Sequence, residues 1–207
     1  MDNNGAEVMP SPEVTLVRHG QTEWSKTGRH TGRTDVPLTD LGRQQAVALG
    51  KMIEDAKFDR VLSSPLSRAW ETMELAGLAN SDVASDDLVE WDYGDYEGRP
   101  TAEIRVDLPG WTVWTHPIVG GESIEDVSAR ADRVIDSVLE SEGSIVMFAH
   151  GHILRILAAR WMGLAPDAGR ALSLDTATRS TLGWERENRV IRTWNVMCSI
   201  HSGDPSV

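Results

Sequence analysis

The chain contains 207 residues, 40% of them hydrophobic and 25% charged, and carries a formal net charge of −12 at pH 7. This length can bury one substantial core, so we predict a single domain over residues 13–207 after a flexible N-terminal tail at 1–12. The negative charge argues against nucleic acid and anionic membrane surfaces as partners. The sequence has no apolar run of about 18 residues, so we expect no membrane span.

Cysteine usage and the first residues bear on the cellular compartment. Cys198 is the only cysteine of the sequence, which excludes a disulfide within the chain and suits a reducing environment. Residues 2–7 are polar and acidic, without the basic and then apolar order of a secretory signal. We therefore expect a cytoplasmic protein.

The first half of the chain alternates between predicted strands and helices. Residues 14–17 are β-branched and aliphatic and predict a buried strand, whereas residues 24–34 are polar and predict a loop. Thr39 is a candidate N-cap, because apolar residues follow it at helical spacing. A second strand is expected over 58–64, with a helix after it at 66–78. Two strand–helix pairs are typical of a parallel sheet with crossover helices.

The second half begins with an irregular, acidic stretch at 80–100, followed by a short predicted helix at 101–108 and an irregular stretch at 109–121. The clearest amphipathic helix begins after Ser123 and keeps 3.6-residue apolar spacing to Leu139. A strand at 144–149 and a helix at 153–162 come next. The segments 178–184 and 190–195 alternate in polarity around a turn, which predicts a hairpin at the edge of the sheet.

Three predicted strands end in unusual polar residues: Arg18-His19-Gly20, Ser63-Ser64-Pro65 with Arg68 just beyond, and His150-Gly151-His152. In a parallel sheet such ends open on one edge, which is where α/β proteins bind ligands. Arginine recognises phosphate through planar, bidentate hydrogen bonds. A histidine at a single strand end is more often a buried, hydrogen-bonded core residue, but three converging ends favour an anion site.

These motifs, taken in order, resemble those of the histidine phosphatase superfamily, which includes cofactor-dependent phosphoglycerate mutases and many small phosphatases. The resemblance covers residues 14 to about 155. It rests on Arg18-His19-Gly20, Thr31-Gly32, Leu38-Thr39-Asp40-Leu41-Gly42, Ser63-Ser64-Pro65-Leu66-Ser67-Arg68-Ala69, the segment around Glu90, and Ala149-His150-Gly151. It implies an α/β fold arranged as a three-layer α/β/α sandwich, with a mostly parallel central sheet and an antiparallel edge strand.

The resemblance also implies catalytic roles. His19 would be the nucleophile that attacks phosphorus and forms a phosphohistidine, because imidazole is neutral and nucleophilic near pH 7. Arg18, Arg68 and a protonated His150 would hold the phosphoryl oxygens. Glu90 would protonate the leaving alcohol and then activate the hydrolytic water. Without the ordered motifs, Glu90 would be an ordinary surface glutamate.

Further substrate-binding residues follow from the same resemblance: Thr31, Gly32, Tyr93, Gly151 and His152. Ser25 stands where relatives commonly carry asparagine, so direct phosphate contact there is in question. Trp91, Trp111 and Trp114 are further pocket candidates. We expect His30, His116 and His201 to be solvated or structural.

Three functions within the resemblance remain open. A phosphatase is favoured over a phosphoglycerate mutase, because the segment after Glu90 is short and contains few basic residues before Gly121. A catalytically inactive phosphate-binding protein is the third reading. A metal site at His150 and His152 with His19 lacks a completing carboxylate or cysteine, so we expect no metal and no cofactor. The expected partner is a small phosphorylated metabolite, and the edge hairpin is a candidate surface for a homodimer.

Overall fold

The computed structural model describes residues 12–78 and 82–198. The predictions of a flexible tail at 1–12 and of a structural or solvated His201 therefore lie almost wholly outside the described residues. The strands are β1 (Glu13–Arg18), β2 (Arg60–Ser63), β3 (Asp82–Ala84), β4 (Ser144–Ala149), β5 (Thr178–Glu185) and β6 (Asn188–Met197). The α-helices are α1 (Glu23–Lys26), α2 (Asp40–Ile53), α3 (Ser67–Leu75), α4 (Thr101–Asp107), α5 (Ile124–Leu139) and α6 (Gly151–Trp161).

The strands form one sheet in the order β3-β2-β4-β1-β5-β6. β1, β2, β3 and β4 run parallel, and β5 pairs antiparallel with β1 and with β6. β5 and β6 form the predicted hairpin at one edge of the sheet. The predicted mostly parallel sheet with an antiparallel edge is therefore confirmed.

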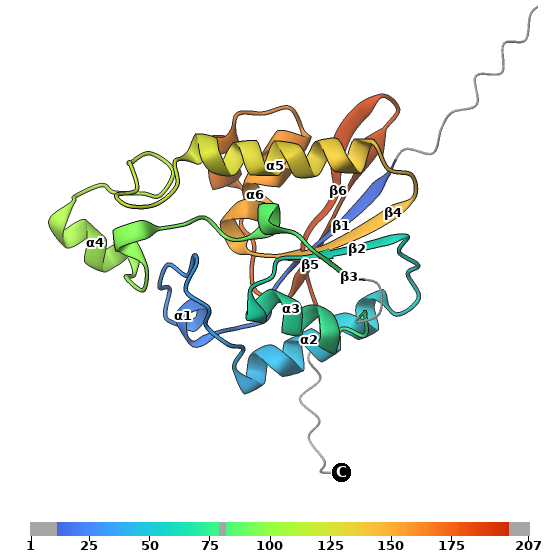
Figure 1. Ribbon diagram of the computed structural model, residues 1–207, viewed down its shortest axis with the longest axis horizontal. Coiled ribbons are helices and arrows are strands. Elements are labelled where there is room, and N and C mark those ends of the chain that lie inside the picture. The colour runs from blue at the N-terminus through green and yellow to red at the C-terminus, as the bar shows by residue number, and fades with distance from the viewer. Residues whose placement is uncertain (1–11, 79–81, 199–207) are drawn as a thin grey trace, which may run out of the picture.

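Alternation along the strands distributes side chains between two cores. Leu16, Met147 and Ala149 pack on the face that α5 and α6 cover, whereas Val17 and Phe148 pack on the face of α2 and α3. Successive strand residues point to opposite faces of a sheet, so a continuous apolar run fills both layers. Figure 1 shows the resulting three layers, with the sheet between two pairs of helices. The three-layer sandwich is confirmed.

The order of the strands positions the functional ends. β4 lies between β1 and β2, with Arg18 opposite Ala149 and Ser63 opposite Phe148 in the parallel register. Hydrogen bonds from the His19 amide to the Ala149 carbonyl, and from the Ser64 amide to the Phe148 carbonyl, extend both ladders past the strand ends. The three polar strand ends predicted from the sequence therefore lie side by side.

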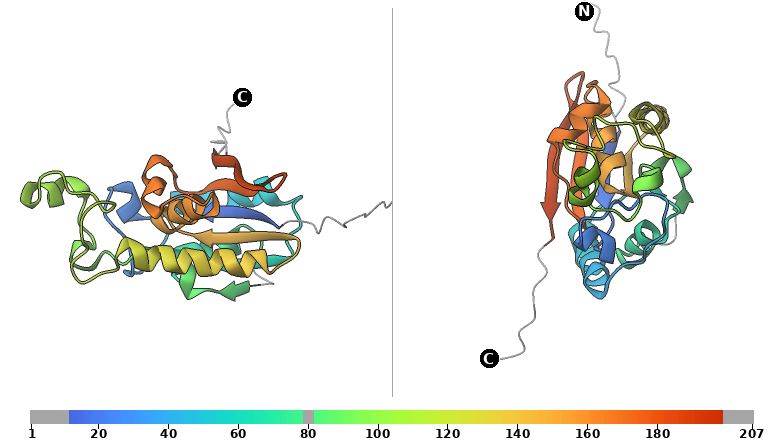
Figure 2. Two further views of the ribbon diagram at one scale, coloured as in Figure 1. Left: turned by 90° about the horizontal axis from the view of Figure 1, so that it is seen from above. Right: turned by 90° about the vertical axis from the view of Figure 1, so that its left-hand side faces the viewer.

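Some local predictions differ from the structure. A one-turn helix, α1, lies within the stretch expected to be a loop, because Thr22 and Ser25 form a reciprocal capping box. β3 was not predicted, and α6 begins at Gly151, directly after the strand. α4 lies apart from the two helical layers at one end of the molecule (Figure 2). None of the helices in the described ranges has the length and apolar character needed to cross a membrane.

Candidate active site

His19 lies directly after β1 and is 4% exposed. Its Nδ1 lies 2.7 Å from the carbonyl oxygen of Gly20. A carbonyl only accepts hydrogen bonds, so Nδ1 carries the proton and the lone pair of the neutral ring lies on Nε2. Burial lowers the pKa of His19 well below its usual value, and the positive charges of Arg68 and Arg18 lower it further. His19 is therefore a neutral imidazole whose lone pair lies on Nε2.

Two glycines fix the turn that follows His19. Gly20 lies against the backbone of Gly42 near the start of α2, where a Cβ on Gly20 would lie 2.9 Å from the Gly42 carbonyl carbon. A Cβ on Gly42 would likewise lie 2.9 Å from the amide nitrogen of Gln21 and would collide with its carbonyl oxygen. The Gly20 amide donates to Thr72 Oγ1 at 3.0 Å. The predicted Leu41-Gly42 motif therefore serves to bring α2 against the loop that carries His19.

Arg68, in the first turn of α3, is fully buried. Its guanidinium donates to the carbonyl oxygens of Thr31 at 3.2 Å, Gly32 at 2.8 Å and Thr34 at 3.0 Å. Its Nε donates to Nδ1 of His150 at 3.1 Å. Arg68 thus connects the loop after α1 to the end of β4, and much of its hydrogen-bonding capacity is already used by backbone oxygens.

His150 is fully buried at the end of β4, with its ring centroid 5.1 Å from that of His19. Because Nδ1 accepts from Arg68, the proton lies on Nε2, which donates to Ser64 Oγ at 2.8 Å. Burial and the charge of Arg68 lower the pKa of His150 well below its usual value. A buried ring beside a guanidinium favours the neutral form, so His150 is neutral in this structure, and its protonation beside phosphoryl oxygens stays a prediction.

Glu90 is 4% exposed and lies at the N-terminus of α6. Its Oε1 accepts from the amides of Trp91 and Ile153, and its Oε2 from the amide of His152, each at 2.9 Å. These N–H groups hold both oxygens of the side chain in place at the start of the helix. Glu90 is therefore a buried acidic group fixed beside Gly151 and His152, not an ordinary surface glutamate.

Arg18 is the last residue of β1, and its guanidinium lies near Glu90. Its Nη1 donates to the Leu174 carbonyl, and its buried Nε has no hydrogen-bond partner within the described residues. Burial lowers the pKa of Arg18, and the nearby Glu90 opposes this shift. A Cβ on Gly151 would lie 3.5 Å from the guanidinium carbon of Arg18 and 3.6 Å from Glu90 Oε2. Gly151 therefore leaves the guanidinium and the carboxylate facing the same space.

That space is a cavity of about 180 Å³. Its lining includes eight of the eleven site residues predicted from the sequence: Arg18, His19, Ser25, Thr31, Glu90, Tyr93, Gly151 and His152. Arg68, His150 and Gly32 are not part of this lining. Gly32 contributes its carbonyl to Arg68, and a Cβ there would collide with Glu97 and with the Trp91 carbonyl.

The side chains of three predicted substrate-binding residues already have protein partners. Ser25 Oγ donates to the Thr22 carbonyl at 3.0 Å and accepts from the Thr22 amide at 2.8 Å, so its hydroxyl belongs to the cap of α1. The Tyr93 hydroxyl lies 2.6 Å from Nδ1 of His152. Burial raises the pKa of Tyr93 well above its usual value and lowers that of His152 well below, so both groups are neutral.

The sequence did not identify five residues that complete the lining: Gly28, Arg29, His30, Arg155 and Leu174. His30 is not solvated, since burial lowers its pKa to about 4 and its Nε2 lies 3.1 Å from Thr101 Oγ1. The Arg155 guanidinium carbon lies 4.7 Å from the centre of the Trp114 ring. Arg155 follows His152 by three residues on α6, which is the helical spacing that could have identified it.

The tryptophan predictions are partly wrong. Trp91 and Trp111 are 1% and 0% exposed and belong to the larger core, and neither lines the cavity beside His19. Trp91 and Trp114 instead line a second cavity of about 520 Å³ together with His116. Within the described part of the chain, no three His, Cys, Asp or Glu side chains gather closely enough to hold a metal ion.

The fold and the site can be compared with known proteins. The family model of the histidine phosphatase superfamily (branch 1) matches residues 14–197 of this chain. An acid phosphatase of Mycobacterium tuberculosis is 42% identical, over 83% of this chain and 86% of the relative. A protein of Salmonella paratyphi A described as a "probable phosphoglycerate mutase" is 31% identical, over 89% of this chain and 90% of the relative. The solved structure of a protein encoded by an open reading frame of M. tuberculosis has a TM-score of 0.85 at 37% identity, covering 90% of this chain and 98% of that one.

Proposed function

Since the chain belongs to the histidine phosphatase superfamily (branch 1), we propose that it hydrolyses small phosphate monoesters through a phosphohistidine at His19, without a metal ion. The observation that carries this proposal is the tautomer of His19. The Gly20 carbonyl holds the proton on Nδ1, which leaves the Nε2 lone pair for attack beside the Arg18 guanidinium. The expected substrate is a small phosphorylated metabolite.

The first step transfers the phosphoryl group to His19. Its Nε2 forms a bond to phosphorus while the bond from phosphorus to the ester oxygen breaks, and Glu90 in its acid form gives a proton to the departing alcohol. Arg18 is a cation of the cavity lining, together with Arg29 and Arg155, and its Nε, which has no partner within the described residues, can donate to a phosphoryl oxygen as charge develops. Arg68 and His150 act behind it by holding the loop and the strand end in register.

The second step releases phosphate. Glu90, now a carboxylate, takes a proton from a water molecule, whose oxygen attacks phosphorus as the bond to His19 Nε2 breaks. His19 and Glu90 thereby return to their initial protonation states. The buried position of Glu90 among backbone N–H groups keeps it at one place through both steps.

Hydrolysis is favoured over phosphoryl transfer between two positions of a substrate. A mutase needs cations that grip the second anionic group and close the site against water. The basic residues between Glu90 and Gly121 are already occupied and do not line the cavity. Arg99 pairs with Glu103 and Asp107 at 2.9 Å each, and Arg105 Nε donates to the Trp111 carbonyl at 2.8 Å. His116 Nδ1 accepts from the Thr112 amide at 3.2 Å.

The test compares wild type, His19→Ala and His116→Ala as a histidine control outside the cavity. Wild type and His116→Ala should hydrolyse p-nitrophenyl phosphate in the presence of EDTA, and His19→Ala should not. Acid-labile, base-stable label from a ³²P-labelled monoester should appear on wild type and be absent from His19→Ala.

Four outcomes would contradict the proposal. Unchanged hydrolysis in His19→Ala would show that His19 is not the nucleophile. Loss of activity with EDTA that zinc restores would indicate a metal enzyme. Phosphoglycerate mutase turnover with negligible hydrolysis would assign the mutase function. Phosphate binding with no turnover of any ester would indicate the inactive binding protein.

A further inference from the structure

Arg130 is a buried charge on the apolar face of α5. It is 7% exposed and lies among Val127, Ala131 and Val134, which pack into the larger core. Its guanidinium makes five hydrogen bonds, which is one for each of its N–H groups. Nothing in the catalytic steps proposed above uses this residue, and it does not line the cavity beside His19.

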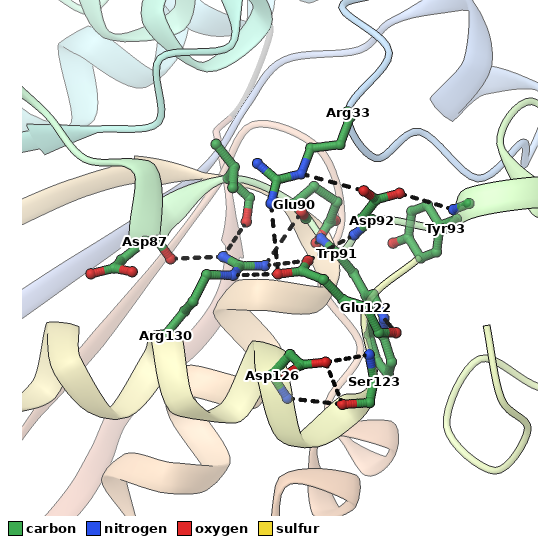
Figure 3. Close-up of polar contacts among 12 residues, drawn as sticks. Arg33, Asp87, Glu90, Trp91, Asp92, Tyr93, Glu122, Ser123, Asp126 and Arg130 are labelled. Atoms are coloured by element: carbon green, nitrogen blue, oxygen red, sulfur yellow. Dashed lines mark hydrogen bonds and ion pairs between the residues drawn. The ribbon is translucent and has the colours of Figure 1, made fainter. Parts of the chain in front are cut away.

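Three of these bonds hold the backbone that leads into Glu90. Arg130 Nη1 donates to the carbonyls of Asp87 at 2.9 Å and Val89 at 2.8 Å, and Nη2 reaches the carbonyl of Glu90 itself at 3.5 Å (Figure 3). The other two bonds go to Glu122, with Nε at 2.8 Å from Oε1 and Nη2 at 2.9 Å from Oε2.

Glu122 holds the backbone and the side chain on the other side of Glu90. Its Oε2 accepts from the Asp92 amide at 3.0 Å, and its carbonyl accepts from Trp91 Nε1 at 2.8 Å (Figure 3). Arg130 and Glu122 together therefore fix residues 87–92 from both sides. From this fixed segment, the Glu90 side chain extends to the backbone amides at the start of α6.

A buried ion pair is weak evidence for stability, because removing two charges from water costs about as much as their attraction returns. An arginine on an apolar helix face must therefore be explained by geometry. We propose that Arg130 and Glu122 are positioning residues for Glu90, and that they set the distance over which Glu90 passes its proton to the departing alcohol. This inference rests on the proposed function.

The effect should depend on the leaving group. A p-nitrophenolate ion departs without protonation, whereas an alkoxide needs the proton of a general acid. A displacement of roughly 1 Å can cost about 100-fold in rate. Arg130→Lys, which can donate at most three hydrogen bonds, should lower kcat/KM on glycerol phosphate by roughly 100-fold and on p-nitrophenyl phosphate by only a few-fold. The comparison uses kcat/KM because this ratio reports the transfer to His19, whereas kcat also includes the hydrolysis of phospho-His19 that both substrates share.

Two matched variants complete the experiment. Glu122→Gln keeps the size of the side chain but removes its charge, and should produce the same selective loss if Arg130→Lys does not fold. Arg133→Lys is the control, because Arg133 lies one turn further along α5 and contacts Asp87 through exposed side chains. It should leave both activities unchanged. Thermal unfolding by circular dichroism checks that each variant is folded.

Glu90→Gln calibrates the assay, and combining it with Arg130→Lys should cause no further loss on glycerol phosphate. Equal losses on both substrates, or none, in folded Arg130→Lys and Glu122→Gln would overturn the inference if Glu90→Gln itself is selective. Additive losses in the double variant would also overturn it. A wild type that hydrolyses neither ester would instead refute the proposed function, and the inference with it.

Discussion

Replacing His30 with glutamine should weaken the acid sensitivity of the fold. The pKa of His30 in the folded protein is about 4, because burial disfavours its charged form, whereas the ordinary value is 6.5. The unfolded chain therefore binds more protons than the folded protein as pH falls below 6.5. Stability contributed by the neutral ring is complete above pH 6.5 and is lost as pH falls toward 4.

The size of the effect follows from these two pKa values. At pH 5, protonation of His30 in the unfolded state removes about 2 kcal/mol from the free energy of unfolding, and the loss approaches about 3 kcal/mol near pH 4. For a chain of 207 residues, 2 kcal/mol corresponds to a melting temperature lower by about 4–8 °C. Glutamine can keep the hydrogen bond to Thr101 and does not titrate.

The assay is urea unfolding of wild type and His30→Gln at pH 8 and pH 5, with the midpoint and slope fitted separately. Any constant cost of the substitution appears at both pH values. The loss of unfolding free energy between pH 8 and pH 5 should be about 2 kcal/mol smaller in His30→Gln. If the two proteins lose the same amount, His30 is not a buried neutral base and the reasoning fails.

Two further predictions concern His19. Gly42→Ala forces a Cβ against the Gln21 backbone, so it should lower the free energy of unfolding by about 1–3 kcal/mol. It should also lower kcat, because the loop that carries His19 is displaced. A variant with unchanged melting temperature and kcat would contradict this prediction. Burial, Arg68 and Arg18 lower the pKa of His19 well below its usual value, so the nucleophile stays neutral in acid. The pH profile of kcat/KM should therefore show no loss centred near 6.5, and such a loss would show that His19 titrates normally.

The sequence identified the parts of the site that follow from strand order. His19, Arg68 and His150 each come just after a strand, and parallel strands bring their ends to one edge of the sheet. Glu90 required the family resemblance, because an acidic residue in an irregular stretch has no periodic signal. The three-residue strand β3 contains an aspartate and is too short for an alternating pattern to be detected.

The protein partners of the site residues were harder to predict. The loops that bring Arg29 and His30 beside His152 have no sequence periodicity, so their convergence depends on tertiary packing. The pKa of His150 is lowered by burial and by the charge of Arg68, which lies 82 positions away in the chain and donates to its Nδ1. Arg130 did carry a detectable signal, namely a charge three residues after Val127 on an otherwise apolar helix face.

The cavity is built from two kinds of wall, and this has an evolutionary consequence. Glu90, in the lining, is held by backbone amides, and Arg68 and His150, which support the lining, are held by backbone carbonyls and by each other, so substitutions there disturb several elements at once. Arg29 belongs to an exposed loop outside this interlocked set. Mutations in the loop that carries Arg29 can accumulate while Glu90, Arg68 and His150 are retained. Proteins that share this fold can therefore change the alcohol portion of the ester that they bind faster than they change the phosphate ester bond that they hydrolyse.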